Sequence, residues 1–158
     1  MKKIIFLFAI MMAASLVTFA QSDLDKGERR MNFGTGFSNY GVPLYFGMDF
    51  GVYPDITAGF VASVRSDNNH FIMGASAVGN YHFNTLLELD SEWDVYAGLS
   101  LGFVFWNYDN KLINQPSPLG LDLQIGGRYY WDETWAVNLE LGGGSAFSGT
   151  RIGVTYKL

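Results

Sequence analysis

The chain has 158 residues, of which 49% are hydrophobic, 16% aromatic and 16% charged, and it contains no cysteine. This length suits one domain, and the many aromatic residues with so few charges exclude an intrinsically disordered chain. A net charge of -5 argues against a nucleic-acid partner, and the lack of cysteine excludes disulfides, zinc–thiolate sites and thiol nucleophiles.

The N-terminus has the features of a secretory signal peptide. Two lysines precede an apolar stretch from Ile4 to Val17, and Ala20 is the small residue expected at a cleavage site. The alternative is a transmembrane anchor, which needs about 20 consecutive apolar residues. We therefore predict a signal peptide over 1–20 and an exported protein, with polar residues 21–29 as a periplasmic N-terminal lead.

From residue 30 onward, the hydrophobic pattern has a period of two. Between Leu44 and Val52 every second residue is apolar, whereas the residues between them include Asp49 and two glycines. Period two is typical of strands, because successive side chains point to opposite faces. No stretch has the pattern of an amphipathic helix. The pattern predicts eight strands, over 30–38, 43–53, 56–65, 71–83, 92–106, 119–131, 134–144 and 149–158.

The connections predict how these strands pair. Residues 53–55 and 132–134 form tight turns, and a longer link covers 84–91. Tight hairpins without a crossover indicate an up-and-down antiparallel sheet. Closing the first strand on the eighth removes both exposed edges and makes a barrel. The remaining connections, at the other end of the sheet, are 39–42, 66–70, 107–118 and 145–148.

The two faces of the strands differ in chemistry. One face is apolar throughout and carries no charge, whereas the other combines charged residues with Gly, Ser and Thr. A soluble ligand carrier would turn the apolar face inward, and a membrane barrel would turn it toward lipid. The apolar set is too bulky for the inside of eight strands, and the polar face is too rich in glycine for a soluble exterior. We therefore predict an eight-stranded antiparallel transmembrane β-barrel over 30–158.

Aromatic residues gather at the two ends of the apolar face, as expected for girdles at the lipid–water interfaces. Those at the loop end are Phe37, Phe71 and Phe105, and those at the tight-turn end are Tyr81, Phe83, Trp93, Tyr129, Trp131, Trp135 and Tyr156.

The last eight residues carry a resemblance to a family. Arg151, Gly153, the antepenultimate Tyr156 and the terminal Leu158 resemble the C-terminal insertion signal of outer-membrane barrels, although Leu158 replaces the usual Phe. With its leader and eight strands, the chain resembles small OmpA/OmpX-type outer-membrane barrels, and its Phe-Ala-Gln junction is similar to Bacteroidetes-type leaders. The resemblance implies the outer membrane of a Gram-negative bacterium. Its implied partners are lipid, periplasmic chaperones and the barrel-insertion machinery.

Six charged residues on the polar face form a predicted lumen charge network. If residue 144 pairs with 149, Glu140 lies diagonal to Arg151, and across the tight turn it lies diagonal to Arg128. One carboxylate between two guanidiniums would plug the lumen, and the alternative is an ion path. The six residues are Asp49, Arg65, Asp122, Arg128, Glu140 and Arg151.

The sequence offers no convincing catalytic or metal site. Ser76 and His82 share the polar face but lie about 20 Å apart along one strand, and no nucleophile–base–acid spacing is evident. Residues 66–70 and 23–28 lack the spacing of a calcium-binding loop. We expect no enzyme, cofactor or metal.

The sequence-based prediction of function is therefore a structural or surface-interaction protein with a plugged polar lumen. The alternative is a narrow pore for ions or very small solutes, and a lipid A-modifying enzyme is a third hypothesis. Residues 107–118, the longest loop, are the candidate surface for a partner.

Overall fold

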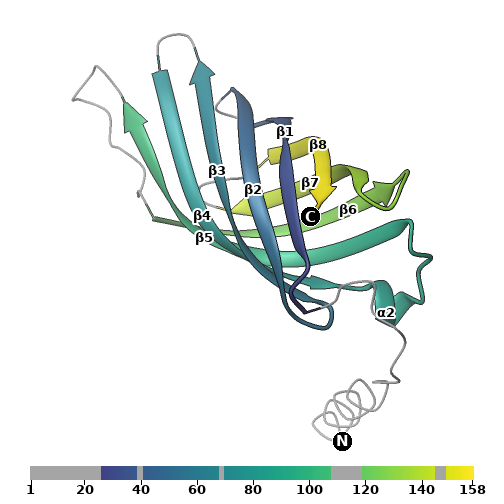
Figure 1. The fold of residues 1–158 in the computed structure, drawn as a ribbon. Coiled ribbons are helices and arrows are strands. Elements are labelled where there is room, and N and C mark those ends of the chain that lie inside the picture. The colour runs from purple at the N-terminus through teal and green to yellow at the C-terminus, as the bar shows by residue number, and fades with distance from the viewer. Residues whose placement is uncertain (1–25, 39–40, 68–69, 108–118, 145–148) are drawn as a thin grey trace, which may run out of the picture.

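The computed structural model describes residues 26–38, 41–67, 70–107, 119–144 and 149–158. It contains eight strands and one short helix (Figure 1). The elements are β1 (Arg29–Phe37), β2 (Val42–Tyr53), β3 (Ile56–Asp67), β4 (His70–His82), α2 (Asn84–Leu87), β5 (Trp93–Asn107), β6 (Leu119–Tyr130), β7 (Trp135–Gly144) and β8 (Gly149–Lys157).

The strands form a closed barrel in which each strand pairs with its neighbours in the sequence. The ring closes between β1 and β8, which are antiparallel from Arg30 opposite Lys157 to Phe37 opposite Thr150. The predicted up-and-down antiparallel barrel and its closure are confirmed. Strand ends differ from the predicted ones by at most two residues.

The apolar face lies outside the barrel. On β2, Leu44 and Phe46 are exposed, with 61% and 42% of their surface accessible. Tyr45, which lies between them, and Asp49, further along the strand, are buried. The interior is correspondingly rich in buried polar and charged side chains, including Arg128. An apolar exterior around a polar interior is the arrangement of a transmembrane barrel.

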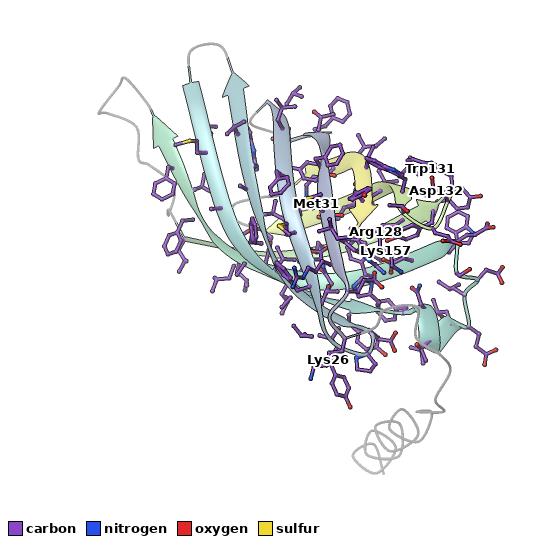
Figure 2. The ribbon with its side chains drawn as sticks, viewed as in Figure 1. Lys26, Met31, Arg128, Trp131, Asp132 and Lys157 are labelled. Atoms are coloured by element: carbon purple, nitrogen blue, oxygen red, sulfur yellow. The ribbon has the colours of Figure 1, made fainter. Side chains whose placement is uncertain are left out.

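One end of the barrel carries the short connections that follow β2 and β6, together with the start of β1 and the end of β8. We call it the turn end, and we call the opposite end the loop end. Trp131 and Asp132 lie at the β6–β7 connection of the turn end (Figure 2). Aromatic side chains pack in pairs there, as predicted for an interfacial girdle. The paired rings are Tyr81 with Phe83, Trp93 with Tyr129, Trp131 with Trp135, and Trp135 with Tyr156.

One element was not predicted. The link between β4 and β5 contains α2, a single helical turn from Asn84 to Leu87 that ends at Glu88, whose φ is +50°. Four residues are too few to produce a helical period in the sequence, so the hydrophobic pattern gave no sign of this turn. Among the described residues, no helix has the length and apolar character needed to cross a membrane.

Candidate functional site in the barrel lumen

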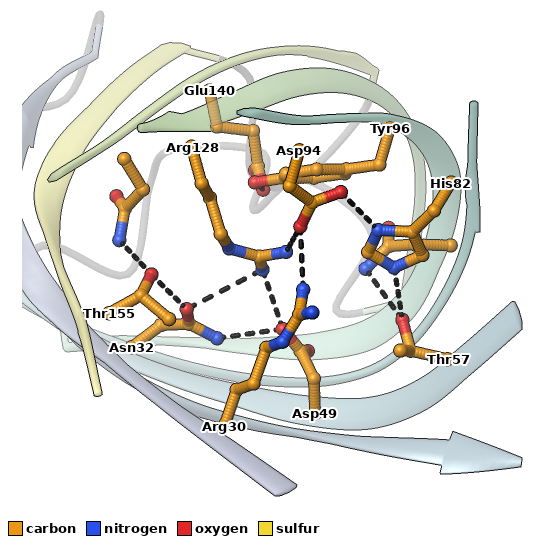
Figure 3. Close-up of polar contacts among 12 residues, drawn as sticks. Arg30, Asn32, Asp49, Thr57, His82, Asp94, Tyr96, Arg128, Glu140 and Thr155 are labelled. Carbon is orange, nitrogen blue, oxygen red and sulfur yellow. Dashed lines mark hydrogen bonds and ion pairs between the residues drawn. The ribbon is translucent and has the colours of Figure 1, made fainter. Parts of the chain in front are cut away.

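Four buried ions occupy the turn-end half of the lumen, and we call them the turn-end cluster: Arg30, Asp49, Asp94 and Arg128. Arg128 on β6 donates from Nη1 to Asp94 Oδ2 at 2.8 Å and from Nη2 to Asp49 Oδ2 at 2.7 Å. Arg30 donates from Nη1 to the same Asp94 oxygen at 2.6 Å. Each side chain is at most 4% exposed. Figure 3 shows Arg128 between the two carboxylates. Buried charges are stable only when paired in this way.

His82 extends the turn-end cluster along the inner wall of the barrel, over β3, β4 and β5. Its Nδ1 lies 2.6 Å from Asp94 Oδ1, and its Nε2 lies 3.1 Å from Thr57 Oγ1 (Figure 3). Because an ionised carboxylate only accepts hydrogen bonds, Nδ1 donates to Asp94. The order Thr57–His82–Asp94 matches the order of a nucleophile, base and orienting acid. However, His82 is fully buried and Thr57 is 1% exposed, so no substrate can reach the hydroxyl.

The sequence excluded Ser76 as a partner of His82 on distance, but it did not predict the two true partners, Thr57 and Asp94. Thr57 lies on β3 and Asp94 on β5, the two neighbours of β4. A signal was available, because the alternation places all three side chains on the inward face. What the alternation could not supply was their common height along the barrel axis, which depends on strand register.

A chain of hydrogen bonds through uncharged side chains continues from Asp49 of the turn-end cluster toward the loop end. Asn32 Nδ2 donates to Asp49 Oδ2 at 2.8 Å, and Thr155 Oγ1 donates to Asn32 Oδ1 at 2.7 Å. Asn138 Nδ2 then donates to Thr155 Oγ1 at 2.9 Å, and Tyr45 OH donates to Asn138 Oδ1 at 2.7 Å. These bonds connect β2, β1, β8 and β7, so they cross-link the barrel wall through its interior.

Glu140 and Arg151 form a separate pair nearer the loop end. They lie directly opposite each other on β7 and β8 and form an ion pair, and Tyr96 OH donates to Glu140 Oε2 at 3.0 Å. The two side chains are 12% and 15% exposed. This pair is less buried than the turn-end cluster.

The predicted geometry around Glu140 was wrong in two respects. Gly149 pairs with Gly142 rather than with residue 144, so Glu140 faces Arg151 instead of lying diagonal to it. Glu140 does lie opposite Gly126, as expected, but the guanidinium of Arg128 bonds to Asp49 and Asp94. Glu140 is therefore not held between two guanidiniums.

The other two residues of the predicted charge network are also buried. Arg65 on β3 is 5% exposed, and its Nη1 lies 3.4 Å from Ser38 Oγ. Asp122 on β6 is 2% exposed and lies opposite Gly144. The structure thus joins Asp49 with Arg128 and Glu140 with Arg151, and it leaves Arg65 and Asp122 closer to the loop end.

Described residues line three cavities along the lumen. The largest, which we call the vestibule, is about 540 Å³ and opens at the turn end, where Arg30, Asp94 and Tyr130 are among its lining residues. A cavity of about 20 Å³ lies beyond Arg128, and one of about 10 Å³ lies beside Arg65. In the part of the chain that the structure describes, no group of three His, Asp or Glu side chains could hold a metal ion.

The predicted insertion signal lies on and just after β8. Arg151 and Gly153 are at inward positions, and Tyr156 packs against Trp135 with ring centroids 4.7 Å apart. Leu158 is 59% exposed, and its backbone N–H donates to Arg29 O at 2.9 Å. The role of these residues in insertion stays a prediction.

Several predictions fall outside the described residues. These are the signal peptide over 1–20, the first part of the lead (21–25) and nearly all of the candidate partner loop (108–118). The likeness of the leader to Bacteroidetes-type leaders likewise stays a prediction.

Comparison with known proteins supports the fold. No family model and no curated protein matches the chain. Among solved structures, the N-terminal β-barrel domain of Pseudomonas aeruginosa OprF superposes with a TM-score of 0.61 and 16% identity, covering 85% of this chain and 98% of that one. The outer membrane protein OprG of Pseudomonas aeruginosa gives 0.60 and 12%, over 84% and 96%. A de novo designed transmembrane β-barrel gives 0.62 and 14%, over 85% and 98%. The chain therefore has the fold of small outer-membrane β-barrels.

Proposed function

We propose that the protein is an integral outer-membrane β-barrel of a Gram-negative bacterium, with a structural or surface-interaction role and a lumen plugged by its own side chains. The fold shared with OprF and OprG supports the membrane assignment. The exposed apolar exterior supports it independently, because a soluble barrel would have to leave that surface in water.

The observation that carries the plugged lumen is the turn-end cluster. Arg128 reaches from β6 to Asp49 on β2 and Asp94 on β5, so its side chain spans the interior. Beyond it the cavities are about 20 and 10 Å³. Because one water molecule needs about 10–15 Å³, these spaces hold roughly one water each. A hydrated ion does not fit without displacing the cluster.

A narrow pore for ions or very small solutes is the second candidate, and the vestibule favours it. This cavity of about 540 Å³ brings solvent as far as Asp94 and Arg30. A rearrangement of the ion pairs above it would then open a path to the loop end.

The same geometry argues for a non-enzymatic role over a lipid A-modifying activity. The one nucleophile–base–acid arrangement found among the described residues, Thr57–His82–Asp94, is closed to substrate. Outer-membrane lipid is the proposed surrounding partner. The last residues of β8 would be read by the insertion machinery and its chaperones, and residues 107–118 would meet a surface partner.

Planar-bilayer recording of the reconstituted protein separates the plug from the pore. We expect stable insertion, seen as protection of the barrel from added protease, together with no steady current above the bare bilayer. A reproducible open level would contradict the plugged lumen and support the pore. In that case Arg128→Ala should raise the open level, whereas Gly143→Ala, an exposed position with open space around it, should leave it unchanged.

A further inference from the structure

Two exposed leucines lie at the turn end, outside the strands. Leu86 and Leu87 of α2 have 52% and 56% of their surface accessible. Neither lines the vestibule, although Asn84 at the start of the same helix does. Figure 1 shows α2 projecting at the end of the barrel, beside the start of β5. The link therefore turns a polar residue toward the lumen opening and apolar residues away from it.

The structure holds α2 in a defined position. Asn84 Nδ2 donates to Trp93 O at 2.7 Å, and Asn84 Oδ1 accepts from the backbone N–H of Val95 at 3.1 Å. Thr85 Oγ1 donates to Asp55 Oδ1 at 2.9 Å, which ties the helix to the β2–β3 turn as well. The two leucines are thus presented by an anchored turn.

The surface of α2 continues the apolar exterior of the barrel. On the outward face of β4, Met73 and Tyr81 are 47% and 42% exposed, and the Tyr81 ring packs edge-on against Phe83 with centroids 5.1 Å apart. Phe83 immediately precedes α2. Exposed apolar residues of the lipid-facing belt are thus followed along the chain by the girdle residues Tyr81 and Phe83 and then by Leu86 and Leu87.

The charges around α2 specify the kind of surface it fits. Between residues 83 and 95 the chain has no Lys or Arg, and Glu88, Asp90 and Glu92 are exposed. Carboxylates would be repelled by an anionic surface and would meet the amine groups of zwitterionic headgroups favourably. Exposed apolar side chains next to an aromatic girdle lie at the depth of the lipid headgroups, where interfacial elements are found.

We propose that α2 is an interfacial foot, whose Leu86 and Leu87 enter the headgroup–acyl boundary of the lipid leaflet at the turn end. The inference rests on the proposed transmembrane placement and adds a contact outside the strands. The foot extends the lipid contact of the β4–β5 side beyond the girdle. It therefore fixes how deeply that side of the barrel sits.

The absence of cysteine allows a direct test with single labelled positions. Leu87→Cys is labelled with an environment-sensitive fluorophore in phosphatidylcholine nanodiscs, which leave both faces open to iodide. Leu123→Cys, at a 65% exposed position of the outer belt, is the lipid control, and Glu133→Cys, in the β6–β7 turn at the same end, is the water control.

We expect the label at position 87 to show a blue-shifted emission and a loss of iodide quenching relative to position 133, approaching the behaviour of position 123. If the label at position 87 is quenched as strongly as the label at position 133 while the label at position 123 is protected, the proposed foot is wrong and the transmembrane barrel still stands. Quenching at all three positions would overturn the membrane placement itself. Leu86→Cys is the second variant, and it should report the same protection as Leu87→Cys.

Discussion

The two halves of the lumen use the same Arg–carboxylate chemistry at different depths. In the turn-end cluster, Arg128 bonds to two carboxylates, and every ion is at most 4% exposed. Nearer the loop end, Arg151 forms an ion pair with one carboxylate, Glu140, and donates to Gln124 Oε1 at 3.4 Å. The Glu140 and Arg151 side chains are 12% and 15% exposed. The difference teaches that burial and the number of partners, rather than the count of charges, decide where the barrel is closed.

The reason is the cost of removing an ion from water. When one partner of a part-exposed ion pair is removed, water can solvate the remaining charge, so the free energy of unfolding falls only a little. A fully buried ion depends on its partners. Removing one partner leaves an uncompensated buried charge, which lowers the free energy of unfolding by about 3–5 kcal/mol. The turn-end cluster should therefore dominate stability, and the Glu140–Arg151 pair should contribute little.

The largest expected effect is that of Arg128→Met. Among the described residues, the hydrogen bond from Asn32 would be the side-chain contact left to the Asp49 carboxylate, so we expect the free energy of unfolding to fall by about 3–5 kcal/mol. Urea titration in lipid vesicles measures the change. Adding Asp49→Asn to this variant should recover part of the loss, because the orphaned carboxylate is then removed. Equal stability of Arg128→Met and the native chain would show that the cluster adds nothing.

The next effect concerns packing around the same guanidinium. Arg128 lies over the Tyr96 ring at 4.4 Å, and Gly126 makes room for that ring: an added Cβ would come within 2.4 Å of Tyr96 Cζ. We expect Gly126→Ala to lower the free energy of unfolding by about 2 kcal/mol through overpacking.

Gly143→Ala is the matched control for Gly126→Ala. Nothing lies within 4 Å of a Cβ built there, so we expect a change of at most about 0.5 kcal/mol. Similar urea midpoints for the two alanine variants would contradict tight packing of the Tyr96 ring between Gly126 and Arg128.

The smallest effect is expected for Glu140→Ala. Arg151 would lose its carboxylate, and Tyr96 would lose the acceptor of its hydroxyl, but both lie beside the cavity of about 20 Å³. Since the two side chains are 12% and 15% exposed, solvent can partly replace the lost partner, and we expect a loss of about 1 kcal/mol, read from the midpoint of thermal unfolding. A loss as large as that of Arg128→Met would remove the distinction between the two halves.

The sequence predicted the barrel well because its main signal is local. Alternation along each strand is set by the pleat, so the inward position of residues such as Asp49 and Arg128 followed directly. Partners across the lumen were not predictable in the same way. Arg30 and Asp94 are 64 residues apart, and their contact depends on the closure and shear of the whole barrel.

Register was the other limit. Gly142-Gly143-Gly144 offers no side chains to fix the β7–β8 pairing, so a shift of two residues kept the same faces and could not be recognised from the alternation. This shift changed the neighbour of Glu140 from Gly153 to Arg151. Where a run of glycines precedes a loop, the sequence therefore says least about how the two strands pair.

The central claim is that burial at the turn end closes and stabilises the barrel. It is tested most directly by unfolding Arg128→Met and Arg151→Met side by side in one urea titration. The two substitutions remove the same group from the same barrel, but at different depths. We predict a loss for Arg128→Met that is at least about 2 kcal/mol larger than the loss for Arg151→Met. Equal losses, or a larger loss for Arg151→Met, would contradict the account.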